Sequence, residues 1–200
     1  MKIKVLLWSL LFLLLFIACD VTNKNVVEKP NILFFLIDDQ RNDMMSCAGH
    51  PIIQTPTIDA LAQNGIRFTN AFVTTSICAA SRASILTGLY ESKHNYTFGK
   101  KPIKTEFMGD SYPFLLKKSG YETGFIGKFG VSIKAQDSML VQMFDFYKPS
   151  PKSGPHFVQL TDGSKRHSAE IKGDEAVQFL KNQSKEKPFC LSISFNAVHA

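Results

Sequence analysis

Apolar residues occur along the chain in two patterns, as short continuous runs and at spacings of three to four positions. The continuous runs predict strands buried in a parallel sheet, at residues 31–37, 121–126 and 188–197. The helical spacing is present in residues 55–64, 81–89, 112–119 and 168–182. Because strands and helices alternate, the pattern predicts an α/β fold with a mostly parallel sheet flanked by helices.

Two further segments have weaker patterns. Residues 66–73 alternate between apolar and polar side chains, which predicts a further strand. The stretch 135–167 is polar, contains proline and lysine and shows no clear period. We therefore expect an irregular excursion over the surface there.

The first 19 residues have a basic start, an apolar middle and a small residue before Cys19. This composition predicts a secretion signal, and the apolar run is shorter than the roughly 20 residues that span a bilayer. Ala18-Cys19 resembles a bacterial lipobox, which implies that Cys19 becomes the lipidated first residue; ordinary cleavage nearby is the alternative. Residues 20–30 then form a polar tether. We expect an exported protein, in the periplasm or at the cell surface, held to the membrane by a lipid anchor.

The charge of the chain restricts its partners. The formal net charge is +6, and removal of Lys2 and Lys4 with the leader leaves 21 basic against 17 acidic residues. So mild an excess, without a concentrated basic block, argues against nucleic acid as a partner and weakly favours an anionic substrate.

Two adjacent acids, Asp38 and Asp39, follow the first predicted strand directly. In an open α/β sheet the carboxyl ends of the strands form the ligand-binding edge. Adjacent carboxylates repel each other unless a cation joins them, and oxygen-rich sites suit Ca²⁺ or Mg²⁺. A solvated turn or a helix cap is the alternative for such a pair.

Cys78 and Arg82 are one helical turn apart in the segment SICAASRASILTGLY. A helix that begins there directs backbone N–H groups and its positive dipole end at an anion, and the guanidinium faces the same place. The expected oxidising compartment also indicates that one cysteine has a use other than an intramolecular disulfide. After Cys19 an odd number remains, namely Cys47, Cys78 and Cys190, so at least one forms no intramolecular disulfide.

The full string resembles the signature of the sulfatase family, C-x-[PA]-S-R-x₄-T-G. It is matched by Cys78, Ala80, Ser81, Arg82, Thr87 and Gly88. The segments PNILFFLIDDQ and TPTIDALAQNGIRFTNAF resemble the family's opening in the same order, so the similarity is continuous from Pro30 to about Tyr90. The resemblance implies an alkaline-phosphatase-like α/β fold and hydrolysis of sulfate esters.

The resemblance also implies a cofactor set. Cys78 would be oxidised to formylglycine by a sulfatase-maturating enzyme, and the aldehyde hydrate would attack sulfur and later expel sulfate. Asp38 and Asp39 would bind Ca²⁺ together with the oxygen of the modified Cys78. Arg82 would hold the formylglycine and stabilise developing negative charge.

Two later segments match the family less closely. GKFG at residues 127–130 resembles the G-K-W-H segment, so Lys128 would bridge the sulfate and the nucleophile, whereas Gly130 stands where many members have a catalytic His. His199 follows the last predicted strand and would contact sulfate and protonate the leaving alkoxide; capping of the strand end is the alternative. His50 and His94 are expected to serve packing or solvent-facing roles.

The family's remaining calcium ligands come from a later segment that has no counterpart here. We therefore expect residues 31–200 to be the amino-terminal part of a sulfatase catalytic domain, negligibly active by itself. Sulfated glycans or aryl sulfates would be substrates. The alternatives are a phosphate or phosphonate ester hydrolase of the same fold, and a non-catalytic, lipid-anchored binding protein or decaying fragment.

Overall fold

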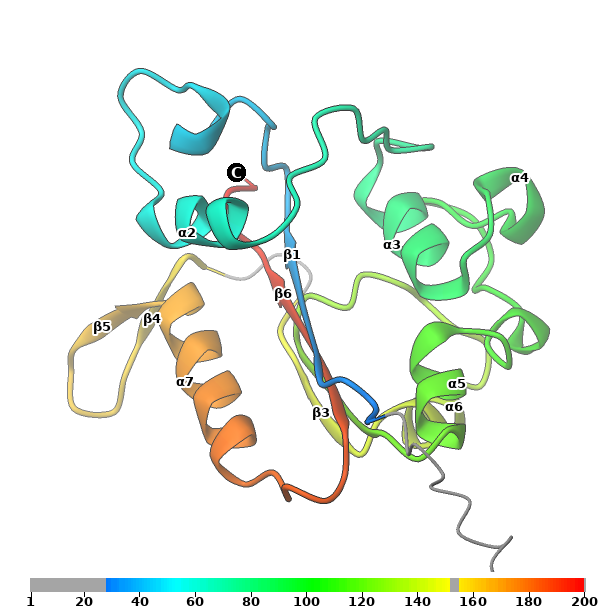
Figure 1. Cartoon of the computed structure of the whole chain (residues 1–200). Coiled ribbons are helices and arrows are strands. Elements are labelled where there is room, and N and C mark those ends of the chain that lie inside the picture. Colours follow the sequence, from blue (N-terminus) through cyan, green and yellow to red (C-terminus); the bar gives the residue numbers. More distant parts are fainter. Residues whose placement is uncertain (1–27, 152–154, 200) are drawn as a thin grey trace, which may run out of the picture.

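A computed structural model describes residues 28–151 and 155–199 of the chain (Figure 1). The main sheet has four strands, all parallel, in the order β1-β6-β2-β3. These strands are β1 (Ile32–Ile37), β6 (Phe189–Phe195), β2 (Glu122–Gly127) and β3 (Phe146–Pro149). The strands predicted at 31–37, 121–126 and 188–197 are confirmed within two residues at each end. The leader, Cys19 and most of the tether lie outside the described residues.

The last strand inserts between the first two. Ile32 pairs with Cys190 and Ile37 with Phe195, while Gly127 at the end of β2 pairs with Ser194. This register brings the carboxyl ends of β1, β6 and β2 to one edge of the sheet, where open α/β sheets bind their ligands.

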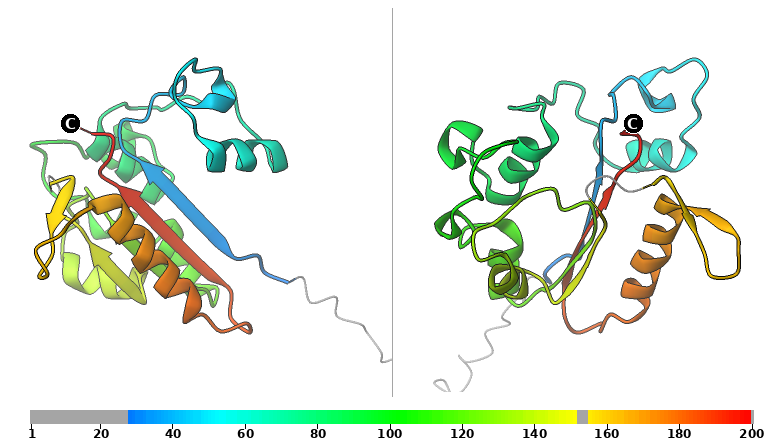
Figure 2. Two further views of the ribbon diagram at one scale, coloured as in Figure 1. Left: turned by 90° about the vertical axis from the view of Figure 1, so that its left-hand side faces the viewer. Right: turned by 180° about the vertical axis from the view of Figure 1, so that it is seen from behind.

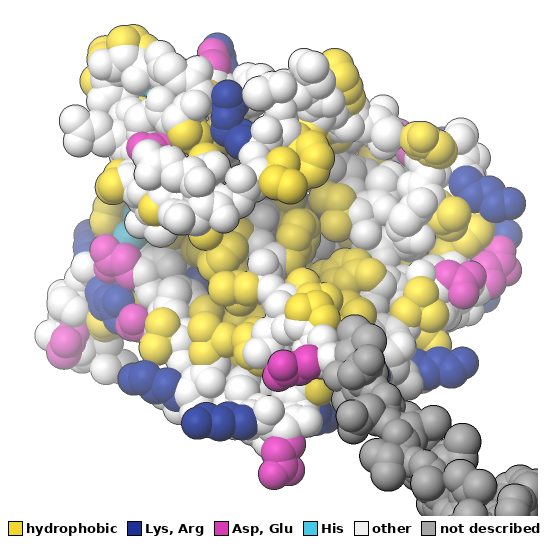
Figure 3. Space-filling view, viewed as in Figure 1, with side chains coloured by type: hydrophobic (Ala, Val, Ile, Leu, Met, Phe, Trp, Pro, Cys, Tyr) yellow, Lys and Arg dark blue, Asp and Glu magenta, His cyan; other side chains and the backbone are white. Residues whose placement is uncertain are grey.

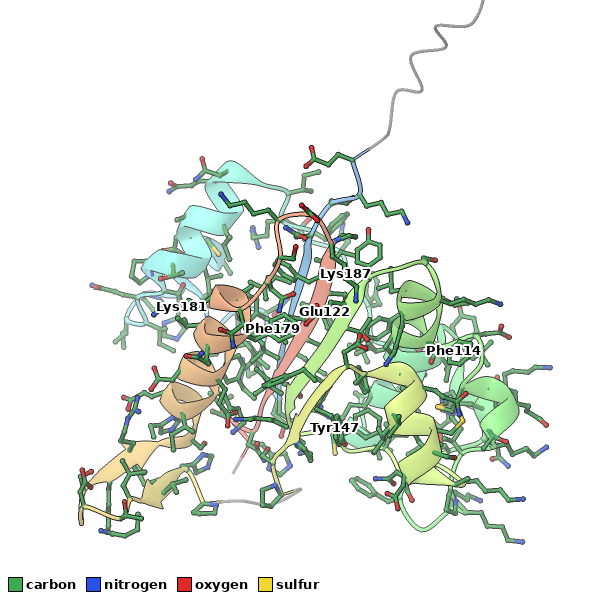
Figure 4. All side chains as sticks on the ribbon, turned by 90° about the horizontal axis from the view of Figure 1, so that it is seen from below. Phe114, Glu122, Tyr147, Phe179, Lys181 and Lys187 are labelled. Atoms are coloured by element: carbon green, nitrogen blue, oxygen red, sulfur yellow. The ribbon has the colours of Figure 1, made fainter. Side chains whose placement is uncertain are left out.

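Helices cover the two faces of the sheet unequally (Figures 1 and 2). On one face lie α3 (Cys78–Thr87), α5 (Tyr112–Lys118) and α6 (Gln136–Met143), around a core that includes Phe125, Phe129 and Met143. On the other face α7 (Ser168–Lys181) packs through Ala176 and Phe179 onto Ile126, Leu191 and Ile193. Phe179 lies between α7 and the strands in Figure 4.

The shorter elements connect and flank this frame. They are η1 (Ser46–Ala48), α2 (Pro56–Asn64), α4 (Glu91–His94), η2 (Thr105–Phe107) and the antiparallel hairpin of β4 (Phe157–Gln159) and β5 (Lys165–His167). No helix among the described residues has the length and apolar character needed to cross a membrane.

The face of β1 that points to the α7 side is not covered by α7. Leu33 and Phe35 are 42% and 48% exposed, although Phe35 stacks on Phe195 at 6.3 Å between ring centroids. Apolar side chains accordingly gather in the hollow between α2 and α7 in the space-filling view (Figure 3). The continuous apolar run of β1 thus belongs to an edge strand with one buried and one half-exposed face in the described sheet.

Two predictions from the pattern were wrong. Residues 66–73 form an irregular connection between α2 and α3, with Ile66 and Phe72 more than 80% exposed, because no described strand lies alongside to pair with them. The stretch 135–167 is not simply irregular, since it contains α6, β3 and the β4-β5 hairpin. These pieces are too short to show a period, and their order comes from burial against the sheet. In addition, α3 begins at Cys78 and not at Ser81.

Candidate active site

Three charged side chains meet in a buried cluster at the carboxyl edge of the sheet. Asp38 follows β1, Lys128 follows β2 and Arg82 comes from α3, and each is at most 6% exposed. The Lys128 ammonium donates to Asp38 Oδ2, and Arg82 Nη2 lies 3.4 Å from Asp38 Oδ1. The cluster contains two cations and one anion, so it carries an excess positive charge out of contact with water.

Arg82 is oriented by one half of its guanidinium. Its Nη1 donates to the Lys128 carbonyl at 2.5 Å and to Ser194 Oγ at 2.6 Å. Its Nε and Nη2 are buried and have no hydrogen-bond acceptor among the described residues. Buried N–H groups of this kind are costly unless a partner occupies the space beside them. Within the described part of the chain, Nη2 has only its ion pair with Asp38 at 3.4 Å and Nε has no acceptor, so this side of Arg82 can still donate to an oxyanion.

Sequence reasoning did not identify Ser194. The signal was present, because Ser192 and Ser194 occupy alternate positions of an otherwise apolar strand. Both are buried, at 2% and 1% exposure. A buried hydroxyl in a strand needs a hydrogen-bond partner, and Ser194 finds it in Arg82.

The turn 127–130 is shaped by two glycines with positive φ. At Gly127, with φ of 99°, a Cβ atom would lie 1.9 Å from the Ser194 carbonyl oxygen, to which the Lys128 N–H donates at 2.9 Å. At Gly130, with φ of 71°, a Cβ atom would lie 2.6 Å from Arg82 Cδ. Only glycine lets the turn close around the arginine in this way. The stem of Arg82 thus lies against residue 130.

Cys78 is the first residue of α3 and is half-buried. The first N–H groups of a helix have no intrahelical acceptor, and Ile77 at the N-cap supplies no side-chain bond to them. Ala79 and Ala80 behind Cys78 are buried, so this end of the helix packs closely on the core. Cys78 consequently stands at a helix end that attracts anions, one turn before Arg82.

Asp39 and His199 form a second, more exposed pair. The Val198 N–H donates to the Asp38 carbonyl at 3.0 Å, which ties the segment after β6 to the segment after β1. His199 Nε2 then lies 3.7 Å from Asp39 Oδ2. Asp39 adopts a φ of 57° and its side chain is 62% exposed. The structure thus brings all the predicted site residues to elements that meet at one edge, with Asp38, Arg82 and Lys128 in direct contact.

Asp38 and Asp39 are the type of ligand that a calcium ion prefers, but they are too few to complete its coordination shell. Hard oxygen ligands such as Asp38 and Asp39 are those that Ca²⁺ prefers, and it takes six to eight of them. Within residues 28–151 and 155–199, no three His, Cys, Asp or Glu side chains are grouped so that they could hold a metal. If calcium binds here, Asp38 and Asp39 would be two of its ligands.

The other titratable groups named in the sequence have structural surroundings. His94 is buried, accepts the Tyr96 N–H on Nδ1 at 3.1 Å and contacts Ser84 Oγ through Nε2 at 3.0 Å. Burial lowers the pKa of His94. The packing role expected for His94 is confirmed. Burial also raises the pKa of Cys190 to about 11, so this thiol is a poor nucleophile.

Comparison with known proteins identifies relatives along almost the whole described chain. The family model for sulfatases matches residues 30–200. An N-acetylglucosamine-6-O-sulfatase of Bacteroides thetaiotaomicron is 34% identical over 192 residues, which are 91% of this chain and 33% of that protein. An ulvan-active sulfatase of Formosa agariphila is 35% identical over 180 residues, or 87% of this chain and 31% of that protein.

A solved structure gives the same picture. A protein crystallised with its substrate D-glucosamine-2-N,6-O-disulfate superposes with a TM-score of 0.70 at 31% identity, over 86% of this chain and 35% of that one. The predicted alkaline-phosphatase-like fold is confirmed by such neighbours. The chain spans about a third of the length of these relatives.

Proposed function

The chain belongs to the sulfatase family, and on that premise we propose that the protein hydrolyses sulfate esters of sulfated glycans with a nucleophile derived from Cys78. The observation that carries the proposal is the buried Arg82, whose Nε and Nη2 have no acceptor among the described residues. It lies beside Lys128 and Asp38 in a cluster with one excess positive charge. A sulfate ester is a monoanion, so its sulfonate group would neutralise this cluster and accept from the free donors.

The nucleophile would be formylglycine at position 78, installed by a sulfatase-maturating enzyme. Its hydrate supplies two geminal oxygens, one for attack on sulfur and the other for expulsion of sulfate. The protein contributes the placement of this residue at the amino end of α3, where the helix N–H groups stabilise negative charge. The half-buried position of Cys78 leaves part of this residue accessible.

Arg82 and Lys128 would bind the sulfonate oxygens and stabilise the charge that grows on them. Arg82 is held in advance by Ser194 and by the Lys128 carbonyl, so little reorganisation is needed when substrate enters. Lys128 is held in place by its hydrogen bond to Asp38. This arrangement is preorganised on rigid elements, because each residue stands at a strand end or within a helix.

His199 would donate a proton to the departing alkoxide oxygen. Its neighbour Asp39 lies 3.7 Å from Nε2. Asp38, Asp39 and the oxygen of residue 78 would also hold Ca²⁺, which supplies Lewis acidity for the bound sulfate. The further oxygen ligands that calcium needs would come from outside the described residues.

The substrate class follows from the relatives. One of them is named for N-acetylglucosamine-6-O-sulfate and another for ulvan, a sulfated polysaccharide. We therefore assign sulfated glycans to this protein, and aryl sulfates as artificial substrates. The amino-terminal sequence supports export to the periplasm or cell surface and lipid attachment at Cys19, with residues 20–30 as the tether.

The first test is the mass of the tryptic peptide 68–82 from protein made in its native host. We expect the loss that accompanies conversion of the Cys78 thiol to an aldehyde. An unmodified thiol, in a host that modifies its other sulfatases, would overturn the proposal and favour a binding protein or a decaying fragment.

The second test is turnover of an aryl sulfate and an aryl phosphate side by side by the full-length protein. We expect faster sulfate hydrolysis, abolished by Cys78→Ala and retained by Cys47→Ala, which removes the other half-buried cysteine. Faster phosphate hydrolysis would instead identify a phosphate ester hydrolase of the same fold.

A further inference from the structure

A cavity adjoins the carboxyl edge of the sheet on the α7 side. Its volume is about 680 Å³, within the range of pockets that hold small ligands. The walls come from the ends of three parallel strands and from α7, and include Gly127, Tyr147, Lys148, Lys172 and Asn196. Tyr147 lies on β3, well away from the carboxyl end of α7, in Figure 4.

Lys172 is the unusual residue of this cavity. It is only 6% exposed, and the one hydrogen bond that its ammonium donates to a described residue is a long one, 3.4 Å to the Ser168 carbonyl. An ammonium group carries three donors, so Lys172 retains hydrogen-bonding capacity on the cavity side. Burial lowers its pKa, and Glu175 opposes that effect. A buried lysine so weakly bonded is stabilised by any anion that reaches it.

The cavity is next to the proposed catalytic cluster. A Cβ atom on Gly127 would lie 3.1 Å from Lys172 Cε, so the lysine stem packs directly on the residue before Lys128. Asn196, which follows β6, also lines the cavity and accepts from Ser150 Oγ at 3.0 Å. Gly127 thus belongs both to the wall of this cavity and to the turn that positions Lys128.

The charge and lining indicate what would bind. Lys148 is paired with Glu175 at 3.6 Å, so Lys172 supplies the excess charge. Pro149, Val158 and Ile171 add apolar surface against which a sugar ring can pack. We propose that this cavity is a subsite for an acidic sugar residue, whose carboxylate or second sulfate is bound by Lys172. The inference rests on the proposed glycan substrate and adds a requirement for a charged neighbour beside the reacting sugar.

The test measures binding, so it does not depend on turnover or on maturation of Cys78. Three disaccharides of equal size, one neutral, one with a uronic carboxylate and one with a single sulfate, are titrated into the Cys78→Ala protein by calorimetry. We expect the two anionic sugars to bind about 10- to 100-fold more tightly than the neutral one, which corresponds to one hydrogen bond to a charged group. Because the uronate disaccharide carries no sulfate, its tighter binding would report on the Lys172 subsite and not on the sulfate-binding cluster.

Lys172→Met should abolish the preference for the uronate, whereas Lys181→Met should retain it. Lys181 is exposed at the end of the same helix and serves as the matched control. Equal binding of the neutral and uronate sugars, or an unchanged preference in Lys172→Met, would overturn the proposal.

A second measurement covers the case in which Lys172→Met does not fold. The wild-type protein is acetylated with and without the uronate disaccharide, and each lysine is quantified by peptide mass. We expect the sugar to slow modification of Lys172 and to leave that of Lys181 unchanged. Equal modification rates at Lys172 would contradict the subsite. If aryl sulfate turnover fails while Lys172 is still protected, the proposed reaction is wrong and the anion site stands.

Discussion

Gly130→Ala tests whether the turn after β2 holds Arg82 in place by close contact. The change adds one methyl group at a φ of 71°, 2.6 Å from Arg82 Cδ and 3.3 Å from its Nε. Two effects follow. The left-handed backbone becomes strained by about 1–2 kcal/mol, and the arginine stem must move, which in a packed interior adds about 1–3 kcal/mol.

Gly163→Ala separates the two effects. Gly163 has a φ of 85° and nothing within 4 Å of the position of a Cβ atom, so its replacement introduces backbone strain alone. We expect Gly130→Ala to lower the free energy of unfolding by about 1–3 kcal/mol more than Gly163→Ala does. The measurement is urea unfolding, with the midpoint shifted and the slope unchanged.

A double-mutant cycle tests whether Arg82 is the side chain that the added methyl group displaces. Arg82→Ala removes Cδ, so in that background Gly130→Ala should destabilise the protein no more than Gly163→Ala does. The reasoning is refuted if the two glycine substitutions have equal effects in the wild-type background. It is also refuted if the excess persists without the arginine.

Two other substitutions probe the buried charges. Asp38→Asn should lower the free energy of unfolding by about 3–5 kcal/mol, because it leaves the buried Lys128 without its anion. Combining Asp38→Asn with Lys128→Met should recover part of this loss, as measured by the denaturant midpoint. No recovery would contradict the pairing. Burial lowers the pKa of His94 below its ordinary value of 6.5, so the folded state should lose stability as the pH falls through 6.5 and level off below the folded pKa. Thermal unfolding of wild type and His94→Gln between pH 7.5 and about 5 checks this, and parallel profiles would contradict it.

The strands and the long helix could be predicted because their patterns are local and strong. The runs in β1, β2 and β6 are continuous, and α7 has Ile171, Ala176, Phe179 and Leu180 at helical spacing. Residues 66–73 failed because alternation describes a half-buried strand only when a neighbouring strand is available. The pieces of 135–167 were missed since three- and four-residue strands are defined by their partners.

The candidate site was predicted where its residues fall in contiguous motifs. Asp38, Arg82 and Lys128 were named from the sequence and lie in contact in the structure, while their catalytic roles stay predictions. Ser194 and Lys172 could not be found in this way. The role of each residue depends on a contact with a residue that is distant in sequence. Ser194 contacts Arg82, and Lys172 contacts the turn at Gly127.

The insertion of β6 between β1 and β2 sets the order of events during synthesis. Ile32 cannot pair with Cys190 until translation has passed that residue, so β1 lacks this neighbouring strand until then. Pairings so distant in sequence form late in folding. Ser194 and the Val198 N–H arrive with this strand and the residues after it, so Arg82 and the Asp38 carbonyl gain these two partners together. An enzyme that needs Cys78 in an extended chain would therefore have the interval from the synthesis of Arg82 to that of Phe195 in which to act.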